Sequence, residues 1–239
     1  MADNYQSQYI YLNEDYYSKP KEMFKCMGEK IRGVYPNHEF SVLDVGCARG
    51  EFLYYLKHLS GLKIKHIAGV DYSQGLIDSA QRFAGLKGVA FQCGKAENFQ
   101  LNQKFDVITM SGVLSFFDDI HQPLLNLRNH LENNGVIFIL GLFNTFDVDV
   151  RTIYRNNKYN QNFEYGYNNH SLETVKKVLD EMNMKISHID KFHLPFDLVP
   201  QEDPIRSWTM ITPEGRKFIN GMGLIYDATI LEIRKKDKL

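Results

Sequence analysis

Short apolar segments rich in β-branched residues alternate with segments of helical periodicity between residues 40 and 142. The apolar segments cover residues 40–45, 64–70, 89–93, 105–110 and 136–142. Such strand and helix alternation builds a parallel sheet with helices on both of its faces. A chain of 239 residues with 44% hydrophobic residues can bury one core of this kind. We therefore expect a single α/β domain over residues 1–239.

Helix signals separate these strands. The expected helices cover residues 19–35, 51–59, 74–84 and 172–182, with one more from about residue 123 to residues 133–135. Pro20 and Pro123 suit first helical turns, where the missing N–H costs nothing. Ser73 and Ser171 stand where a hydroxyl can cap the helix that follows. The sequence thus gives both the periodicity and the starting points of the helices.

The last third of the chain follows a different pattern. Residues 144–169 are rich in Tyr, Phe, Arg and Asn and have no clean period, whereas two strands are expected at residues 184–192 and 224–233. Between these strands, residues 208–219 alternate around Pro213-Glu214-Gly215, which predicts a small hairpin arm.

Charge and cysteine content limit the partners. Lys and Arg total 28 against 29 for Asp and Glu, so no strong field gathers nucleic acid or an anionic membrane. Cys26, Cys47 and Cys93 lack metal-ligand spacing, and the N-terminus has neither a basic start nor an apolar run. No apolar stretch approaches the roughly 20 residues of a membrane helix. We expect a soluble, reduced, cytoplasmic protein without nucleic-acid or membrane partners, whose oligomeric state the sequence leaves open.

The segment Val42-Leu43-Asp44-Val45-Gly46-Cys47-Ala48-Arg49-Gly50 is the strongest functional signal. An apolar strand runs into a glycine turn, and Gly46 and Gly50 permit a tight turn with close backbone approach to a ligand. Asp44 lies between two apolar residues at a buried strand end, which is costly unless something hydrogen-bonds its carboxylate. The amino group of a ligand would supply that partner, although a purely structural hydrogen bond is the alternative.

A second acid, Asp71, ends the next predicted strand, where a carboxylate can accept hydrogen bonds from both hydroxyls of a ribose. In open α/β sheets, ligands bind beyond the carboxyl ends of the strands. Asp44, Asp71, the Ala96-Glu97 turn and Ser111-Gly112 should therefore converge at one edge of the sheet.

From about residue 40 onward the chain resembles the class I S-adenosylmethionine (SAM)-dependent methyltransferases, because several motifs match in order. Residues 44–50 match the glycine-rich first motif, which holds the methionine part of the cofactor. Asp71 matches the acid that grips the ribose, and residues 94–97 resemble the loop that contacts adenine. The resemblance implies SAM as cofactor, S-adenosylhomocysteine (SAH) as product, and these cofactor-binding residues: Asp44, Gly46, Cys47, Gly50, Asp71, Tyr72, Ala96, Glu97 and Ser111. It also implies a Rossmann-like, mostly parallel sheet of seven strands whose last strand, residues 224–233, is antiparallel.

Two other functional classes remain open. A nicotinamide-dependent dehydrogenase also combines a strand, a glycine turn and a downstream acid, but Ala48 stands where its fingerprint has the second glycine. Holding a pyrophosphate also gives no reason for Asp44 inside the strand. A SAM-binding protein without catalysis, acting as a sensor or assembly partner, would keep the same cofactor motifs. Nicotinamide binding would identify the first alternative, and tight SAM binding without turnover the second.

The acceptor is predicted to be a small polar metabolite that is methylated on oxygen, such as a sugar or nucleotide-linked sugar. Residues 203–209 with Asn220-Gly221 are similar to a bacterial methyltransferase subgroup associated with sugar and surface-polysaccharide clusters. We expect residues 144–169 and 197–223 to form the acceptor side and residues 1–39 an N-terminal cap. His170 is the candidate base for a hydroxyl acceptor. No metal site is expected, because Asp118-Asp119 has no ligands at useful spacing and suits a solvated loop before a helix.

An aromatic group lies within the first of these insertions. Its members are Tyr154, Tyr159, Phe163, Tyr165 and Tyr167. These side chains could form a lid over the acceptor pocket or simply pack within the insertion, and the sequence favours neither interpretation.

Overall fold

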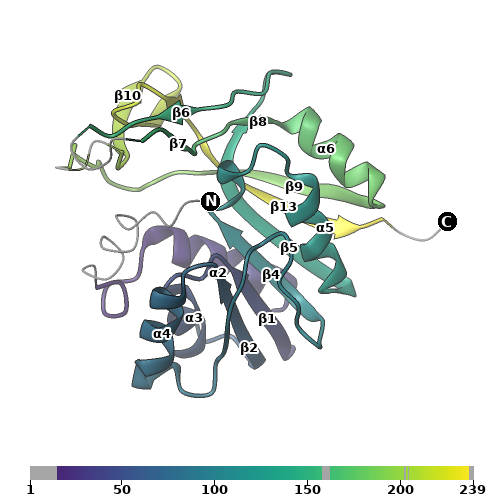
Figure 1. Ribbon diagram of the computed structural model, residues 1–239. Coiled ribbons are helices and arrows are strands. Elements are labelled where there is room, and N and C mark those ends of the chain that lie inside the picture. The colour runs from purple at the N-terminus through teal and green to yellow at the C-terminus, as the bar shows by residue number, and fades with distance from the viewer. Residues whose placement is uncertain (1–14, 158–161, 202, 204, 237–239) are drawn as a thin grey trace.

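A mostly parallel sheet forms the centre of the computed structural model, which describes residues 15–157, 162–201, 203 and 205–236 (Figure 1). Seven strands follow the spatial order β3-β2-β1-β4-β5-β13-β9. They are β1 (Phe40–Val45), β2 (Ile64–Asp71), β3 (Ala90–Cys93), β4 (Phe105–Ser111), β5 (Leu131–Asn144), β9 (Met184–Phe192) and β13 (Ala228–Lys235). The neighbouring pairs among β1 to β5 are parallel, whereas β13 is antiparallel to both β5 and β9. The Rossmann-like fold with an antiparallel last strand is confirmed.

The sheet contains eight strands, so the expected number of seven was wrong. The additional strand, β8 (His170–Ser171), pairs in parallel with the end of β5 through Phe143 and Asn144. Two residues cannot show the alternation that identifies a strand in a sequence. This strand exists because the chain returns to the sheet after residues 144–169, and it places His170 beside the end of β5.

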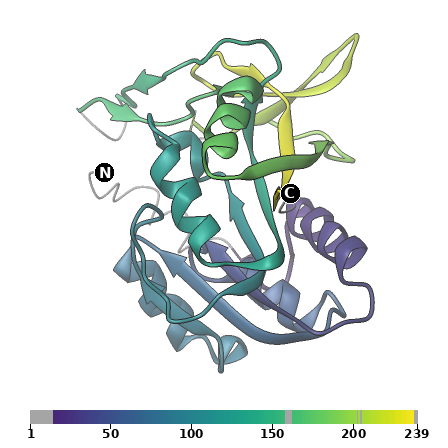
Figure 2. The ribbon, with the colours of Figure 1, turned by 90° about the vertical axis from the view of Figure 1, so that its right-hand side faces the viewer.

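Helices cover both faces of the sheet (Figures 1 and 2). They are α2 (Glu22–Val34), α3 (Glu51–His58) and α4 (Gln74–Arg82) on one face, and α5 (His121–Asn129) and α6 (Leu172–Glu181) on the other. Successive strand residues point to opposite faces, so Val42 packs with the first group and Leu43 with the second. Across the described ranges, every helix falls short of the length and hydrophobicity that a bilayer crossing demands.

The predicted caps of α4 and α6 are confirmed. The Ser73 hydroxyl accepts a hydrogen bond from Leu76 N at 3.4 Å, and the Ser171 hydroxyl accepts one from Thr174 N at 3.0 Å. Each hydroxyl satisfies a backbone donor that the first helical turn leaves unpaired.

The predicted end of α5 was wrong. The helix stops at Asn129, and residues 131–135 belong to a longer β5. Leu131 pairs with Phe105 of β4, and a register shift separates this pair from that of Val107 with Val136. Gly135 fits where an added Cβ would lie 2.9 Å from the Asp106 carbonyl oxygen. Pairing with β4 therefore overrides the local turn signal of the Asn-Asn-Gly sequence.

The predicted strand over residues 224–233 divides into two. Residues 225–226 form β12 (Ile225–Tyr226), which joins β10 (Trp208–Thr212) and β11 (Gly215–Ile219) in a separate sheet. Asp227 separates β12 from β13, and its carboxylate binds Lys191 and Lys217 at 2.8 Å each. The hairpin predicted for residues 208–219 is confirmed by antiparallel pairing of β10 with β11. Both views show this sheet at the same end of the molecule as the β6 (Ile153–Tyr154) and β7 (Glu164–Tyr165) pair.

Candidate functional site

The turn between β1 and α3 has a left-handed backbone at three positions. Gly46 has φ +80°, Ala48 φ +48° and Gly50 φ +78°. Glycine is required at position 46 for two reasons. Its positive φ favours glycine, and an added Cβ would lie 2.2 Å from a Val113 methyl carbon. Gly46 N and Cys47 N both donate to the Val70 carbonyl oxygen, at 2.8 and 3.1 Å. The turn is thereby tied to the end of β2.

Asp44 is buried in β1, with 5% of its surface exposed. The Thr109 hydroxyl, on the neighbouring strand β4, donates to Asp44 Oδ1 at 2.7 Å. Burial raises the pKa of Asp44 to about 7, and the nearby Asp71 and Glu51 carboxylates add to this rise, although the Thr109 hydrogen bond opposes it. The Thr109 contact shows that part of the hydrogen bonding expected of a ligand comes from the protein itself.

Asp71 ends β2 and fixes the same turn from the other side. Its Oδ2 accepts a hydrogen bond from Ala48 N at 2.9 Å, and its Oδ1 accepts one from Ser73 N at 2.9 Å. Burial raises its pKa, while these backbone hydrogen bonds act in the opposite direction. Asp71 therefore links the glycine turn, the end of β2 and the start of α4.

The site carries more buried acid than base. Glu51, the first residue of α3, is 4% exposed, and burial raises the pKa of its carboxyl. With Asp44 and Asp71 it makes three buried carboxyl groups around one turn. Arg49 is a cation beside them, and its Nε lies 3.7 Å from Glu51 Oε1. This imbalance favours a ligand that brings positive charge of its own.

The ends of β3 and β4 lie at the same edge of the sheet. Register pairs Asp71 with Cys93 at the end of β3 and Val45 with Met110 near the end of β4. In the loop after β3, Asn126 Nδ2 holds the Ala96 carbonyl oxygen at 3.0 Å, and buried Glu97 Oε2 has no hydrogen-bond partner within the described part of the chain. A polar ligand group would satisfy this oxygen.

The remaining predicted cofactor residues lie nearby in the chain but differ in exposure. Ser111 ends β4 and is half-buried, and Gly112 follows with φ +70° and open space at the position of a Cβ. Tyr72 follows Asp71 and has 36% of its surface exposed, whereas Cys47 is buried. The fold therefore brings all the predicted cofactor positions to the carboxyl edge of β1 to β4.

Comparisons with known proteins agree with this geometry. Residues 43–137, which include the glycine turn and both acids, match the model of a methyltransferase domain family. A malonyl-[acyl-carrier protein] O-methyltransferase of Bacillus anthracis is 32% identical over 111 residues, 46% of this chain and 39% of that protein. Residues 43–137 are thus similar to a methyltransferase domain, and proteins of this fold have been solved with SAM or SAH bound.

Two further proteins match this chain over more of its length. Malonyl-[acyl-carrier protein] O-methyltransferase 2 of Ilyobacter polytropus is 26% identical over 187 residues, 77% of this chain and 65% of that protein. A SAM-dependent methyltransferase from Clostridium acetobutylicum superposes with a TM-score of 0.59 at 15% identity, over 97% of this chain and 96% of that one. The structural likeness shows the shared fold. The chain spans about two-fifths of the length of the Bacillus relative, so acceptor and partners do not transfer from it directly.

The residues at the glycine turn fit SAM. SAM carries a sulfonium and an ammonium group, and the chain offers three buried carboxyl groups around one left-handed turn. Thr109 and Glu51 are parts of this site that the sequence analysis did not identify. Thr109 had a usable signal, because a polar residue between Ile108 and Met110 repeats the pattern that singled out Asp44.

His170 is 5% exposed, and its Nε2 lies 3.0 Å from the Phe117 carbonyl oxygen. Burial lowers the pKa of His170, so the ring is neutral at neutral pH. Asn168 Nδ2 donates to the same carbonyl oxygen at 3.1 Å and to Asp118 Oδ1 at 3.0 Å. The two side chains thus attach the insertion of residues 144–169 to the loop that follows β4. The role of His170 as a base stays a prediction.

Asp118 and Asp119 both act within the loop before α5. Asp118 accepts the hydrogen bond from Asn168, and Asp119 Oδ1 accepts one from His121 N at 2.8 Å, at the start of the helix. These contacts accord with the loop interpretation of the acidic pair.

The aromatic group of the insertion divides in two. Tyr154 and Tyr167 lie edge to face with ring centroids 6.2 Å apart, and Tyr167 also packs against Phe116 of η2 (Leu114–Phe116) at 6.2 Å. Phe163 and Tyr165 are 63% and 59% exposed. Tyr159 lies outside the described residues. Part of the group therefore packs against the loop after β4, and part faces solvent.

Proposed function

We propose that this methyltransferase moves the methyl group of SAM to an oxygen atom of a small polar metabolite, such as a sugar or nucleotide-linked sugar. The observation that carries the proposal is the meeting of Asp44 and Asp71 on adjacent strands beside a left-handed turn. Asp44 would attract the ammonium group of SAM through its negative charge. Asp71 would accept hydrogen bonds from the ribose hydroxyls of SAM. Bound SAM supplies an electrophilic methyl carbon. The chain's own task is to hold the acceptor oxygen against it.

The remaining cofactor contacts follow the same edge of the sheet. We assign the adenine to the loop of Ala96 and Glu97, whose unpartnered Oε2 can accept a hydrogen bond. Tyr72 offers a partly exposed ring beside Asp71, and Ser111 a hydroxyl at the end of β4. Gly46, Cys47 and Gly50 bring the backbone of the turn close to the cofactor.

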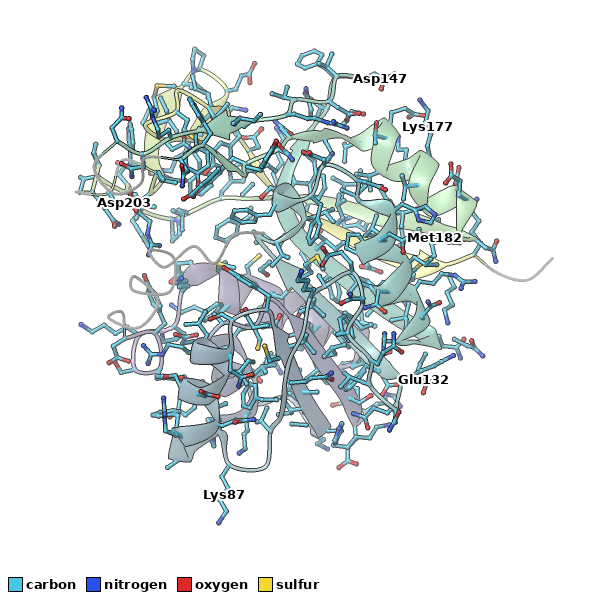
Figure 3. The ribbon with its side chains drawn as sticks, viewed as in Figure 1. Lys87, Glu132, Asp147, Lys177, Met182 and Asp203 are labelled. Carbon is cyan, nitrogen blue, oxygen red and sulfur yellow. The ribbon has the colours of Figure 1, made fainter. Side chains whose placement is uncertain are left out.

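The acceptor side is assigned to residues 144–169 and 197–223, with residues 1–39 as the N-terminal cap. A pocket of about 300 Å³ lies between these two insertions, lined by Tyr154, Arg155, Asn156, Asn157, Ile205, Gly221 and Met222. Its size is at the lower end of the range for small-molecule sites. Asp203, labelled in Figure 3, lies beside it and accepts a hydrogen bond from Asn156 Nδ2 at 3.4 Å. Amide and guanidinium groups suit a hydroxyl-rich acceptor.

The names of the relatives add a second oxygen acceptor to be tested. The Bacillus and Ilyobacter proteins are malonyl-[acyl-carrier protein] O-methyltransferases, and a malonyl group ends in a carboxylate. A carboxylate is already deprotonated at neutral pH, whereas a sugar hydroxyl needs a base. His170 would be that base through Nδ1, because a carbonyl oxygen only accepts and Nε2 must then carry the proton. The two acceptors therefore differ in whether turnover depends on His170.

Calorimetry with SAM and SAH on the purified chain tests the cofactor assignment. Binding of both is expected, and Asp71→Asn should weaken it at least tenfold. SAH formation is then measured with simple sugars, nucleotide-linked sugars and malonyl-acyl carrier protein. Absence of any SAM or SAH binding by the folded chain would refute the proposal. Tight binding without turnover across the panel would instead favour a sensor. We also propose that the protein acts in the cytoplasm.

A further inference from the structure

Tyr17 reaches the glycine turn from the segment that precedes α2. Its hydroxyl donates a hydrogen bond to the Arg49 carbonyl oxygen at 2.6 Å, across 32 positions of sequence. The side chain is 8% exposed. Its ring stacks on Phe83 with centroids 3.9 Å apart and meets the edge of Tyr54 at 5.3 Å. Tyr17 thus packs against α3 and the residue that follows α4, and it also contacts the glycine turn.

The contact matters because the backbone of the turn is strained. Ala48 adopts φ +48°, a conformation that costs a non-glycine residue about 1 kcal/mol or more and persists only when its surroundings enforce it. On one side, Asp71 Oδ2 holds Ala48 N, and Val70 holds the amides of Gly46 and Cys47. Tyr17 holds the peptide between Arg49 and Gly50, through the Arg49 carbonyl oxygen. The left-handed segment is therefore restrained at both of its ends.

Tyr17 also restricts the position of the Arg49 guanidinium, which lies beside the buried carboxyl group of Glu51. The Arg49 guanidinium lies 5.3 Å from the centroid of the Tyr17 ring, within cation–π range, and Arg49 Nε lies 3.7 Å from Glu51 Oε1. Burial raises the pKa of Tyr17 to about 12, so its hydroxyl stays a donor at neutral pH. A hydroxyl that stays protonated suits a fixed hydrogen-bond donor to the Arg49 carbonyl oxygen.

We propose that Tyr17 is a positioning residue for the cofactor, which acts by fixing the Arg49 peptide and guanidinium and so preserves the left-handed turn of residues 46–50. The proposal rests on the assignment of this turn to SAM. It makes the N-terminal segment part of the binding unit, although Tyr17 acts through Arg49 rather than by contact with the reacting atoms.

Tyr17→Phe tests the proposal because it removes one oxygen and keeps the stacked ring. The dissociation constant for SAH, measured by calorimetry at 15 °C, should increase roughly threefold to tenfold, as expected for one hydrogen bond. Tyr55→Phe is the matched control, since Tyr55 is equally buried at 8% but packs against Gly28 of α2. Its SAH affinity should equal that of the wild type. Thermal unfolding without cofactor measures any purely structural loss.

A second variant keeps the test decisive if Tyr17→Phe folds poorly. Phe83→Leu removes the stacking partner while leaving the hydroxyl, and it should weaken SAH binding in the same direction by a smaller factor. A lower melting temperature with unchanged SAH affinity in both variants would overturn the inference. Failure of the wild type to bind SAH would instead refute the proposed function, so the two failures are distinguishable.

Discussion

Replacing Asp44 by asparagine removes one of the three buried carboxyl groups of the site. A carboxyl whose pKa rises from 3.8 in the unfolded chain to about 7 in the folded one favours folding only while it is protonated. Stability from this group is fully present below pH 3.8 and is lost as the pH rises through 7. The cost amounts to about 4 kcal/mol at pH 8 and about 2 kcal/mol at pH 5.5. Asparagine can still accept the Thr109 hydrogen bond and carries no charge.

Asp44→Asn should therefore stabilise the cofactor-free protein, by up to about 4 kcal/mol at pH 8 and by about 2 kcal/mol less at pH 5.5. Urea unfolding at both pH values measures this difference. SAM affinity at pH 8 should fall at least tenfold, because the negative charge that suits the sulfonium and ammonium groups is lost. The variant would thus be more stable but bind SAM more weakly, as expected of a site whose buried charge binds a ligand.

Asp106→Asn provides a control of opposite sign. Burial acts to raise the pKa of Asp106, but hydrogen bonds from Ser41 N and Oγ, at 2.8 Å each, and the nearby Lys65 outweigh it and lower the pKa. Its stability contribution is present above pH 3.8 and is lost on acidification, so this variant should be destabilised at pH 8. If the stability difference between Asp44→Asn and wild type were equal at pH 5.5 and pH 8, the carboxyl would not titrate near 7 and the reasoning would fail.

Three further substitutions test separate parts of the structure. Gly46→Ala places a Cβ 2.2 Å from a Val113 methyl carbon at φ +80° and should weaken SAM binding at least tenfold, so wild-type affinity in calorimetry would contradict the turn geometry. Ser171→Ala removes the cap of α6 and should cost about 1 kcal/mol in urea unfolding; no loss would mean that the cap is dispensable. His170→Gln should reduce turnover of a hydroxyl acceptor about a hundredfold and leave SAH affinity unchanged. Unchanged turnover would remove His170 as the base.

The elements that depend on local pattern could be predicted from the sequence. The bounds of β1 and β9 match the predicted residues, and Ser73 and Ser171 cap the helices that they were expected to cap. Strand alternation, helical periodicity and capping act over a few residues, so one segment carries the whole signal. The turn between β1 and α3 could be predicted for the same reason, because Gly46 and Gly50 lie close together in the sequence.

The sequence predictions failed where a segment far away in the chain determines the secondary structure. Residues 131–135 look like a helix end but belong to β5, where Leu131 pairs with Phe105 of β4, and residues 170–171 become a strand only because β5 ends beside them. No local pattern identifies such pairings, because their hydrogen bonds join segments that are far apart in the chain.

By itself, the sequence determined the order of the main strands and helices, the tight glycine turn, and the two acids, Asp44 within β1 and Asp71 at the end of β2. Only the tertiary structure decided that Thr109 meets Asp44, that Asn168 and His170 share the Phe117 carbonyl, and that Tyr17 supports the turn from the N-terminal segment. The physical reason is distance along the chain. Periodicity reports on neighbours within a turn or a strand, whereas burial and the pKa of a carboxyl depend on every group that the fold packs around it.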